Sequence, residues 1–208
     1  LAGASGNPLA LLNPKLCPIE QSSEHLMTLA WQHALQHYPK FQAFRAIAVQ
    51  QLAQKNAEHL LDLPAQYPQD LLKTQTADDL ELQTTLESLQ LTQAGSIYPQ
   101  QLKDQILEHP LIQFKHAHIH SIVQSNHHQL TLQDSQHTDL GDFNHVIVCC
   151  AKESHAFFKQ FPILKPIRGQ VSWLNNVKHR LDPQYAYSYG GYCMQLDEQH
   201  LILGASFY

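Results

Sequence analysis

The chain has 208 residues, of which 43% are hydrophobic and 15% are charged, and its formal net charge is −5 at pH 7. This composition can bury a sizeable core in one large domain or two small ones, and it excludes intrinsic disorder. The longest apolar run, Val146–Ala151, is too short to cross a bilayer, and the acidic balance argues against a broad nucleic-acid-binding face. Because no charged and then apolar leader is present, we expect no signal peptide.

The first half of the chain predicts mainly helices. Ser22 and Ser23 are candidate N-caps for the first of them, and Pro39 follows its end. In chain order we expect a helix over 24–37, a strand over 44–50, a short helix over 52–61 stopped by Pro64, one or two short helices over 71–91, an extended piece over 95–98, and a helix over 100–108.

The second half predicts mainly strands. We expect one or two strands over 111–123, a turn over 125–128, a return strand over 129–133, a turn over 139–144, a strand buried on both faces over 145–150, a helix over 154–161, and strands over 167–174, 185–195 and 200–208. The last three strands favour an antiparallel sheet, with a boundary near residues 160–166. The predicted fold class is α/β with α+β character.

The four cysteines, Cys17, Cys149, Cys150 and Cys193, form no CxxC pair. Cys149 and Cys150 lie in an apolar, strand-like run, where buried free thiols are the favoured interpretation. This usage fits a reducing cytoplasm. Three of the 15 histidines alternate in KHAHIHSI, so that a strand would place His116, His118 and His120 on one face. With no Asp, Glu or Cys at ligand spacing, background usage explains them better than a metal site, and we expect no metal.

The opening loop, LAGASGNPLALLNPKL, has the chemistry of a phosphate-binding turn. Gly3 and Gly6 allow close approach to the main chain, and Ser5 and Asn7 can cap a helix or donate to an anion. An ordinary helix-entry turn explains the same residues equally well. A serine-hydrolase elbow fits poorly, because Asn7 replaces the second glycine of GxSxG and no strand precedes it. The chain has no GxGxxG fingerprint of a dinucleotide site.

Six segments, in order, carry a resemblance to a known family: GASGNPLALLNPKL, GSIYP, HVIVCCA, IRGQVS, YGGY and LILGASFY. Together they resemble the D-amino-acid-oxidase-like flavoenzymes, which include glycine and sarcosine oxidases. The nearest likeness is the FAD-dependent half of the bacterial bifunctional enzymes that complete 5-methylaminomethyl-2-thiouridine in tRNA. The likeness covers nearly the whole chain.

The resemblance implies an FAD-binding domain interleaved with an antiparallel substrate domain. Residues 1–38 and 100–161 would form part of the former, and residues 39–99 and 162–208 part of the latter. The residues it implies for cofactor binding are Gly3, Ala4, Ser5, Gly6, Asn7, Leu12, Ile119, Cys150, Ala151, Arg168 and Gly169. Residues 189–192 and 204–206 would face the flavin.

The reaction implied by the resemblance is oxidative removal of a carboxymethyl group from a secondary amine of the modified uridine, with the cofactor supplying the chemistry. A tyrosine or arginine would fix the substrate carboxylate, and the tyrosine candidates are Tyr187, Tyr189 and Tyr192. For each of these, a role as a core or edge-strand aromatic is the competing interpretation.

The chain departs from the family pattern at several points. Ala10 and Ala151 stand where glycines are expected, and the stretch after GSIYP is shortened to residues 100–102. The glycine-rich phosphate fingerprint and a C-terminal arginine-bearing motif are both missing. We therefore expect a fragment of a longer enzyme, largely free of FAD and inactive when isolated.

The predicted partners are tRNA and a methyltransferase domain fused upstream, in a cytoplasmic protein with no membrane contact. Two alternatives stay open. One is a glycine- or sarcosine-oxidase-like enzyme acting on free amino acids, and the other is a non-catalytic nucleotide-binding domain.

Overall fold

The chain folds into two units. The computed structural model describes residues 3–13, 15–54, 58–76, 84, 86–125, 129–158, 165–175, 178 and 180–207. Unit 1 is formed by Leu1–Pro110 together with Gly169–Tyr208, and unit 2 by Leu111–Arg168. The two are described separately below.

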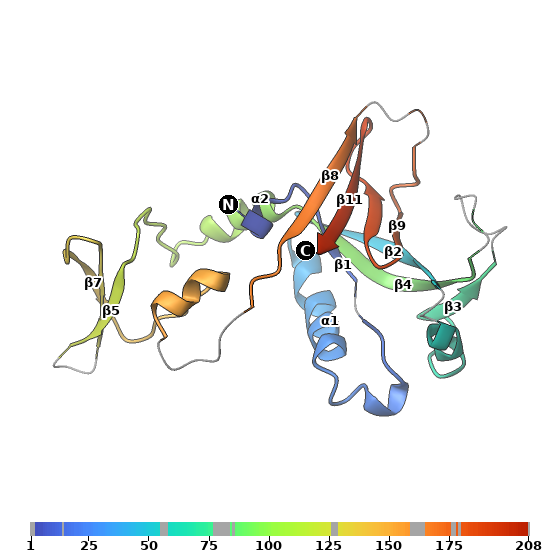
Figure 1. Ribbon diagram of the computed structural model, residues 1–208, viewed down its shortest axis with the longest axis horizontal. Helices are drawn as coiled ribbons and strands as arrows, with labels where there is room; N and C mark the ends of the chain where they lie inside the picture. The colour runs from blue at the N-terminus through green and yellow to red at the C-terminus, as the bar shows by residue number, and fades with distance from the viewer. Residues whose placement is uncertain are drawn as a thin grey trace. The chain divides into compact units, whose positions relative to one another are not determined.

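Unit 1 is built on an eight-stranded sheet (Figure 1). Its strands are β1 (Ala10–Leu12), β2 (Phe44–Leu52), β3 (Leu72–Gln75), β4 (Ser88–Ile97), β8 (Gly169–Asn175), β9 (Tyr185–Ser188), β10 (Tyr192–Gln195) and β11 (His200–Phe207). The order across the sheet is β1-β4-β2-β9-β10-β11-β8, with β3 also pairing with β4. All pairs are antiparallel except β2 with β9. The parallel pair joins strands from the two ends of the sequence.

In the part of unit 1 that the structure describes, two α-helices and four 3-10 helices accompany the sheet. They are α1 (Leu26–His37), α2 (Pro99–Leu107), η1 (Gly3–Gly6), η2 (Ile19–Gln21), η3 (Tyr38–Lys40) and η4 (Glu58–Ala65). Helix α1 is amphipathic, and its buried Trp31 donates from Nε1 to the carbonyl of Gln93 on β4 at 3.0 Å. Because Trp31 both packs and donates, α1 is fixed to one face of the sheet. No helix in the described ranges is long and apolar enough to span a membrane.

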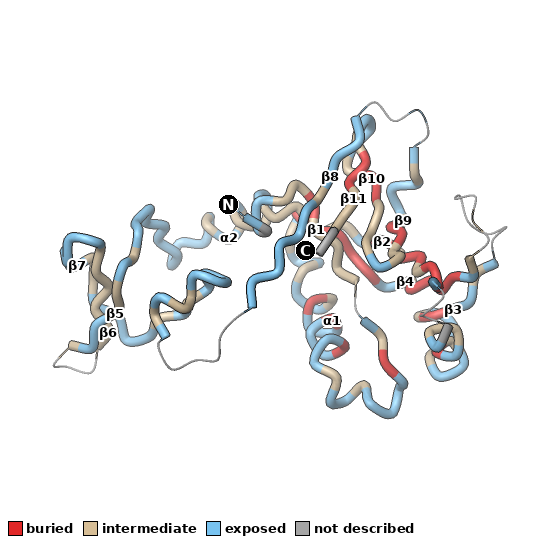
Figure 2. The backbone as a smooth tube through the Cα atoms, in the orientation of Figure 1, coloured by how far each residue is buried: buried red, intermediate tan, exposed pale blue. Residues whose placement is uncertain are grey.

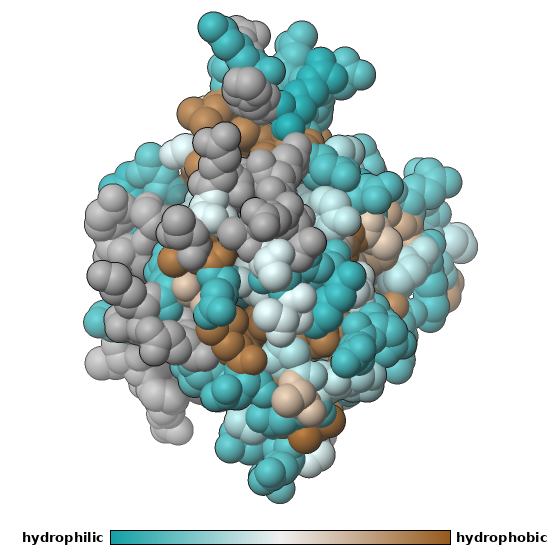
Figure 3. Space-filling view, turned by 90° about the vertical axis from the view of Figure 1, so that its right-hand side faces the viewer, coloured by the Kyte–Doolittle hydropathy of each residue, from teal (hydrophilic) through white to brown (hydrophobic). Residues whose placement is uncertain are grey.

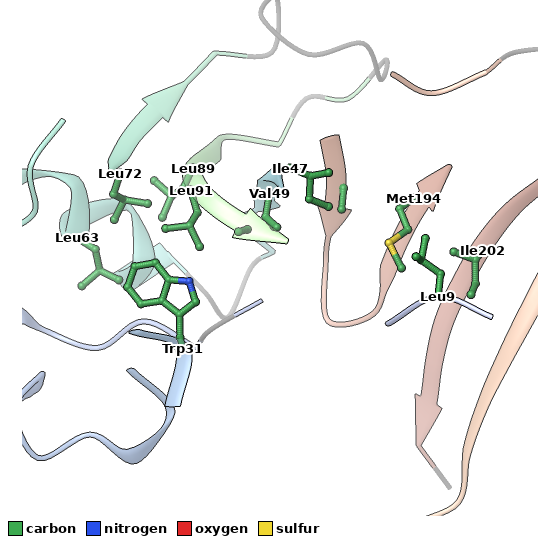
Figure 4. Close-up of a cluster of buried hydrophobic side chains, with 12 residues drawn as sticks. Leu9, Trp31, Ile47, Val49, Leu63, Leu72, Leu89, Leu91, Met194 and Ile202 are labelled. Atoms are coloured by element: carbon green, nitrogen blue, oxygen red, sulfur yellow. The ribbon is translucent and has the colours of Figure 1, made fainter. Parts of the chain in front are cut away.

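The core of unit 1 lies between this face of the sheet and the elements that cover it (Figure 4). The labelled buried residues are Leu9, Trp31, Ile47, Val49, Leu63, Leu72, Leu89, Leu91, Met194 and Ile202. Leu9, which directly precedes β1, lies beside Met194 and Ile202. Burying a side chain of this size stabilises a fold by about 1.5–3 kcal/mol. The opening loop is therefore anchored to the last strands of the chain.

Unit 2 contains a three-stranded antiparallel sheet, β5 (Ser121–Gln124), β6 (Leu130–Gln133) and β7 (Asp139–Phe143), followed by η6 (Ala151–Ala156). Its described residues are half-buried or exposed, in contrast to the buried strands of unit 1 (Figure 2). Figure 3 shows the side of the molecule that carries β3 and β9 of unit 1, where hydrophilic residues surround separate hydrophobic patches.

The structure confirms the predicted fold class and most of the strands at the C-terminal end. It also confirms the helix near 100–108 as α2 and the return strand as β6. The expected strand over 185–195 is a hairpin of two strands, β9 and β10, joined by the turn at Gly190 and Gly191. The turn predicted over 125–128 lies largely outside the described residues.

The prediction of helices over 71–91 is wrong. The described part of this segment contains β3 and the start of β4, while residues 77–83 and 85 lie outside the described residues. Strand β4 lies between neighbours and is buried along most of its length, with Leu89 and Leu91 in the core. Residues 88–92 alternate polar and apolar, which is a strand pattern, so the helix prediction overlooked a signal that the sequence carries.

Two predictions in unit 2 are also wrong. The expected turn over 139–144 is strand β7, which pairs with β6 and accommodates Gly141 at φ +143°. The expected buried strand over 145–150 is not a strand, and Ile147 is 87% exposed. An apolar run forms a doubly buried strand only where neighbouring strands pair with it on both sides. None of the described strands pairs with residues 145–150.

The predicted boundaries of the remaining helical and extended elements are corrected as well. Helix α1 has His25 rather than Ser22 or Ser23 as its N-cap, and Ser22 donates instead to the carbonyl of Ile19. The expected helix over 52–61 is the end of β2 followed by η4, and regular pairing within 111–123 begins only at β5. The helix expected over 154–161 is the earlier turn η6, with residues 159–164 outside the described part.

Candidate functional site

A pocket of about 610 Å³ opens at the turn between β9 and β10, within unit 1. It is lined by Gln54, Gln170, Ser172, Tyr189, Gly190, Gly191, Leu203, Gly204 and Ala205. These residues come from the end of β2, from β8, from the hairpin turn and from β11. Two of the segments singled out in the sequence, YGGY and LILGASFY, therefore form one site.

The glycines of this site are required by close packing of the backbone. A Cβ atom at Gly191 would lie 2.6 Å from the carbonyl oxygen of Gly204, and one at Gly204 would lie 2.8 Å from the ring of Tyr192. Gly190 has φ +93°, a conformation that side chains disfavour. The hairpin and β11 thus meet in close contact, with the Gly204 carbonyl against Gly191 and the Tyr192 ring against Gly204.

Tyr189 and Tyr192 flank this turn. The hydroxyl of Tyr189 donates to the carbonyl of Tyr192 at 3.4 Å. Burial raises the pKa of both tyrosines, and for Tyr189 the neighbouring Cys193 thiol adds to the effect. Burial also raises the pKa of Cys193. Both hydroxyls are therefore protonated hydrogen-bond donors at neutral pH, and Cys193 is held as a thiol.

Tyr187 is separated from Tyr192 by the sheet. It is 1% exposed and pairs with Cys193 in the β9–β10 register, whereas Ser188 pairs with Tyr192. Because successive side chains in a strand point to opposite faces, Tyr187 and Tyr192 lie on different faces. The structure places Tyr189 at the pocket, Tyr192 next to Gly204, and Tyr187 in the interior.

Two residues of the site were missed by the sequence analysis. Gln54 donates from Nε2 to the carbonyl of Tyr189, and Asn13 donates from Nδ2 to Ser188 Oγ at 3.1 Å. The Oδ1 atom of Asn13 is buried and has no hydrogen-bond partner. No local pattern marks either residue, because their partners lie 135 and 175 residues away.

The opening loop forms turn η1 and then β1, which pairs with β4. Gly3 has φ +57°, and a Cβ there would meet nothing within 4 Å. Ser5 and Ala10 line a second pocket of about 530 Å³, whose other walls come largely from α2. Gly6 and Asn7 follow Ser5 at the surface, Ala4 lies within the same turn, and Leu12 packs against the core. The loop therefore exposes backbone where the sequence predicted a phosphate contact.

The remaining predicted cofactor residues fall in unit 2, except Gly169, which begins β8. Ile119 is half-buried, while Cys150 and Arg168 are exposed. Ala151 has φ +49°, the left-handed conformation that favours glycine. This backbone conformation explains the glycine that the resemblance places at this position, and the chain keeps the conformation although the residue is alanine.

The histidine run lies before β5, in a segment without regular pairing, and His120 contacts the ring of His137 instead, with the ring centroids 6.3 Å apart. Within the described residues, no group of three or more metal-ligating side chains converges. Of the cysteines, Cys17 is buried beside Thr28, and Cys193 is half-buried. Cys149 and Cys150 are exposed, so the expectation that they are buried thiols in a strand is wrong.

Comparison of the sequence with known proteins gives a match over its whole length. The chain is 51% identical over 208 residues to the tRNA 5-methylaminomethyl-2-thiouridine biosynthesis bifunctional protein MnmC of Acinetobacter baylyi, and it covers 33% of that protein. It is 28% identical over 244 residues to the protein of the same name from Psychrobacter cryohalolentis, of which it covers 35%. The chain thus spans about a third of the length of the curated relatives it matches. No protein-family model matches it.

Comparison of the fold finds solved oxidases. Amadoriase I, a fructosyl amine:oxygen oxidoreductase from Aspergillus fumigatus, matches 96% of this chain and 53% of its own, with a TM-score of 0.59 and 12% identity. Glycine oxidase from Geobacillus kaustophilus matches 93% of this chain and 57% of its own, with a TM-score of 0.58 and 11% identity. At such identities the likeness shows the fold alone. Over its whole length the chain is therefore similar to about a third of the MnmC proteins of tRNA 5-methylaminomethyl-2-thiouridine biosynthesis, and its fold is similar to those of solved amine and glycine oxidases.

Proposed function

We propose that this chain is part of an FAD-dependent oxidoreductase that removes the carboxymethyl group from 5-carboxymethylaminomethyl-2-thiouridine in tRNA. The observation that carries the proposal is the 51% identity, over the entire chain, to a protein named for the biosynthesis of this nucleoside. The site where the YGGY turn (residues 189–192) meets residues 204–206 of β11 supports the proposal, because it combines a closely packed backbone with protonated tyrosines.

The residues present fit FAD where unit 1 can be tested. The open space above Gly3 and its positive φ suit close approach of a phosphate to the main chain. We propose that residues 3–7 and Leu12 hold the cofactor together with Ile119, Cys150, Ala151, Arg168 and Gly169. When bound, FAD would accept a hydride from the carbon next to the substrate nitrogen.

The chain's own residues would bind and orient the substrate. Because burial keeps the Tyr192 hydroxyl protonated, it can donate a hydrogen bond to the substrate carboxylate, whereas the Tyr189 hydroxyl already donates to the carbonyl of Tyr192. Fixing that group sets the position of the carbon that loses hydride. Water then hydrolyses the oxidised C=N bond, which releases glyoxylate and leaves the aminomethyl nucleoside.

The organisation proposed for the parent enzyme follows the resemblance. Residues 1–38 and 100–161 would contribute to the FAD-binding domain, and residues 39–99 and 162–208 to the substrate domain. The partners would be tRNA and a fused methyltransferase domain, in the cytoplasm. The isolated 208 residues would bind FAD weakly and be inactive.

Purification of the full-length gene product tests the proposal. We expect a bound flavin with visible absorption, and release of glyoxylate from tRNA that carries the carboxymethylaminomethyl group. An absence of flavin from cofactor-replete protein would refute the proposal. Turnover of glycine or sarcosine with none of tRNA would assign the chain to an amino-acid oxidase instead.

A further inference from the structure

The pocket at the β9–β10 turn is lined by neutral hydrogen-bonding groups. Its side chains include the amides of Gln54 and Gln170, the hydroxyl of Ser172 and the phenol of Tyr189, and no Lys, Arg, Asp or Glu occurs among its described lining residues. Such a lining suits an uncharged ligand that carries both hydrogen-bond donors and acceptors. A carboxylate or phosphate would find no cation there.

The orientation of the Gln54 amide is fixed by its partner. The Tyr189 carbonyl can only accept a hydrogen bond, so the group that faces it must be the NH₂ of Gln54. The other end of the amide, Oε1, is then an acceptor, and it would lie 3.7 Å from a Cβ at Gly190. No further hydrogen bond to Gln54 is found within the described part of the chain. The pocket therefore presents an acceptor at a defined place.

The same turn offers a surface for a planar ring. The Tyr189 ring lines the pocket beside Gly191, where an edge atom of the ring would lie 3.4 Å from a Cβ on the glycine. Unpaired bases of RNA are recognised by stacking on aromatic side chains and by hydrogen bonds to their Watson–Crick edges. With a volume of about 610 Å³, the pocket has room for a nucleoside.

We propose that this pocket binds the base of the substrate nucleoside, with Gln54 Oε1 accepting the N3–H of a uracil-type ring. Gln170 and Ser172, whose side chains are exposed on β8, would serve the polar edge of the ring, and Tyr189 would stack. This inference rests on the proposed function and adds the part of the substrate that this site reads.

The donor pattern explains the selectivity expected of such a site. A uracil-type ring has a donor at N3, whereas cytosine has an acceptor there and would face Oε1 with no proton between them. A site built around a hydrogen bond rejects the analogue that lacks it, because the protein group is left unpaired. The net charge of −5 is consistent with this role, since base contacts specify a site while phosphate contacts supply most of the affinity.

Binding to the 208-residue chain is the first test, with free nucleosides as probes in saturation-transfer NMR. We expect saturable transfer to uridine, and at least fivefold less to cytidine and to 3-methyluridine, in which a methyl group replaces the N3 proton. The variant Gln54→Lys keeps an N–H donor for the Tyr189 carbonyl and removes the acceptor, so it should lose the preference. Equal transfer to uridine and 3-methyluridine would overturn the inference.

Turnover by the full-length protein is the second test. Gln54→Lys and the double variant Gln170→Leu/Ser172→Ala should lower kcat/KM on tRNA at least tenfold more than on sarcosine, which lacks a base. The control is Gln93→Leu, an exposed glutamine on β4 outside the pocket. Equal losses of kcat/KM on both substrates would contradict base recognition by this pocket and leave the proposed function standing. A wild-type protein without flavin or without activity on tRNA would refute the proposed function itself.

Discussion

Gly191 faces the backbone of Gly204 so closely that a Cβ atom on Gly191 would lie 2.6 Å from the Gly204 carbonyl oxygen. The obstacle is main chain, so it cannot move aside by a change of rotamer. We expect Gly191→Ala to lower the free energy of unfolding by about 1–3 kcal/mol, the usual cost of overpacking. Urea denaturation of the chain measures this.

Gly204→Ala supplies the matched comparison, because its Cβ would meet the side chain of Tyr192 rather than backbone. Removing that ring with Tyr192→Ala should relieve part of the cost of Gly204→Ala and none of the cost of Gly191→Ala. If the Tyr192 substitution rescues both variants equally, the backbone contact is not the cause.

Ala151 holds a left-handed conformation, with φ +49°, in the first position of η6. This conformation costs an alanine about 1–2 kcal/mol. A glycine avoids that cost, but its larger loss of chain entropy on folding offsets part of the gain. We expect Ala151→Gly to stabilise unit 2 by about 0.5–1 kcal/mol, measured by hydrogen exchange of β5–β7. Ala156→Gly, at the other end of the same turn, should destabilise instead, and equal effects of the two would contradict the conformational explanation.

Asp197 closes the turn between β10 and β11. Its Oδ1 accepts the backbone N–H of Gln199 at 2.8 Å and that of His200 at 3.0 Å, and it contacts the His200 ring at 2.7 Å. The hydrogen bond from the backbone N–H of Gln199 lowers the pKa of Asp197 most, and the interactions with His200 lower it further, so that it lies below its ordinary value. The native state thus binds the proton more weakly than the unfolded state does.

The stability that Asp197 contributes is therefore present above the ordinary aspartate pKa of about 3.9, and it is lost as the pH falls through the lowered native value. Asp197→Asn should flatten this acid branch of the stability curve, measured by urea unfolding between pH 7 and pH 2. An unchanged slope in the variant would show that the turn does not depend on the carboxylate.

The sequence predicted the C-terminal strands well, because their signals are local. It missed the hairpin turn at Gly190 and Gly191, which divides the single strand expected over 185–195 into β9 and β10. Strand β4 was missed although residues 88–92 alternate polar and apolar, as a strand does. Its burial between β1, β2 and β3 depends on partners distant in the sequence, which no local pattern shows.

The candidate site shows the same division. Tyr189, Gly190 and Gly204 stand in recognisable segments, so the resemblance led to them. Gln54 acts through a partner 135 residues away, and no pattern around it distinguishes it from the chain's many other glutamines. Contacts of this kind arise only when β2 and β9 pair, which is a property of the fold rather than of either segment.

Asn13 and Ser188 provide a direct test of the long-range contact that joins the opening loop to the hairpin. Their part-buried hydrogen bond, 3.1 Å long, should stabilise the fold by about 0.5–1.5 kcal/mol. Each alanine variant alone loses this bond, so the double variant should cost about 1 kcal/mol less than the sum of the single ones. Asn13→Ala combined with Thr131→Ala, in unit 2, should instead be additive. Because Asn13 directly follows the strand that leads from the predicted phosphate loop, additivity of Asn13 with Ser188 would mean that the loop and the hairpin are stabilised independently, and the site would then lack the rigidity that substrate orientation requires.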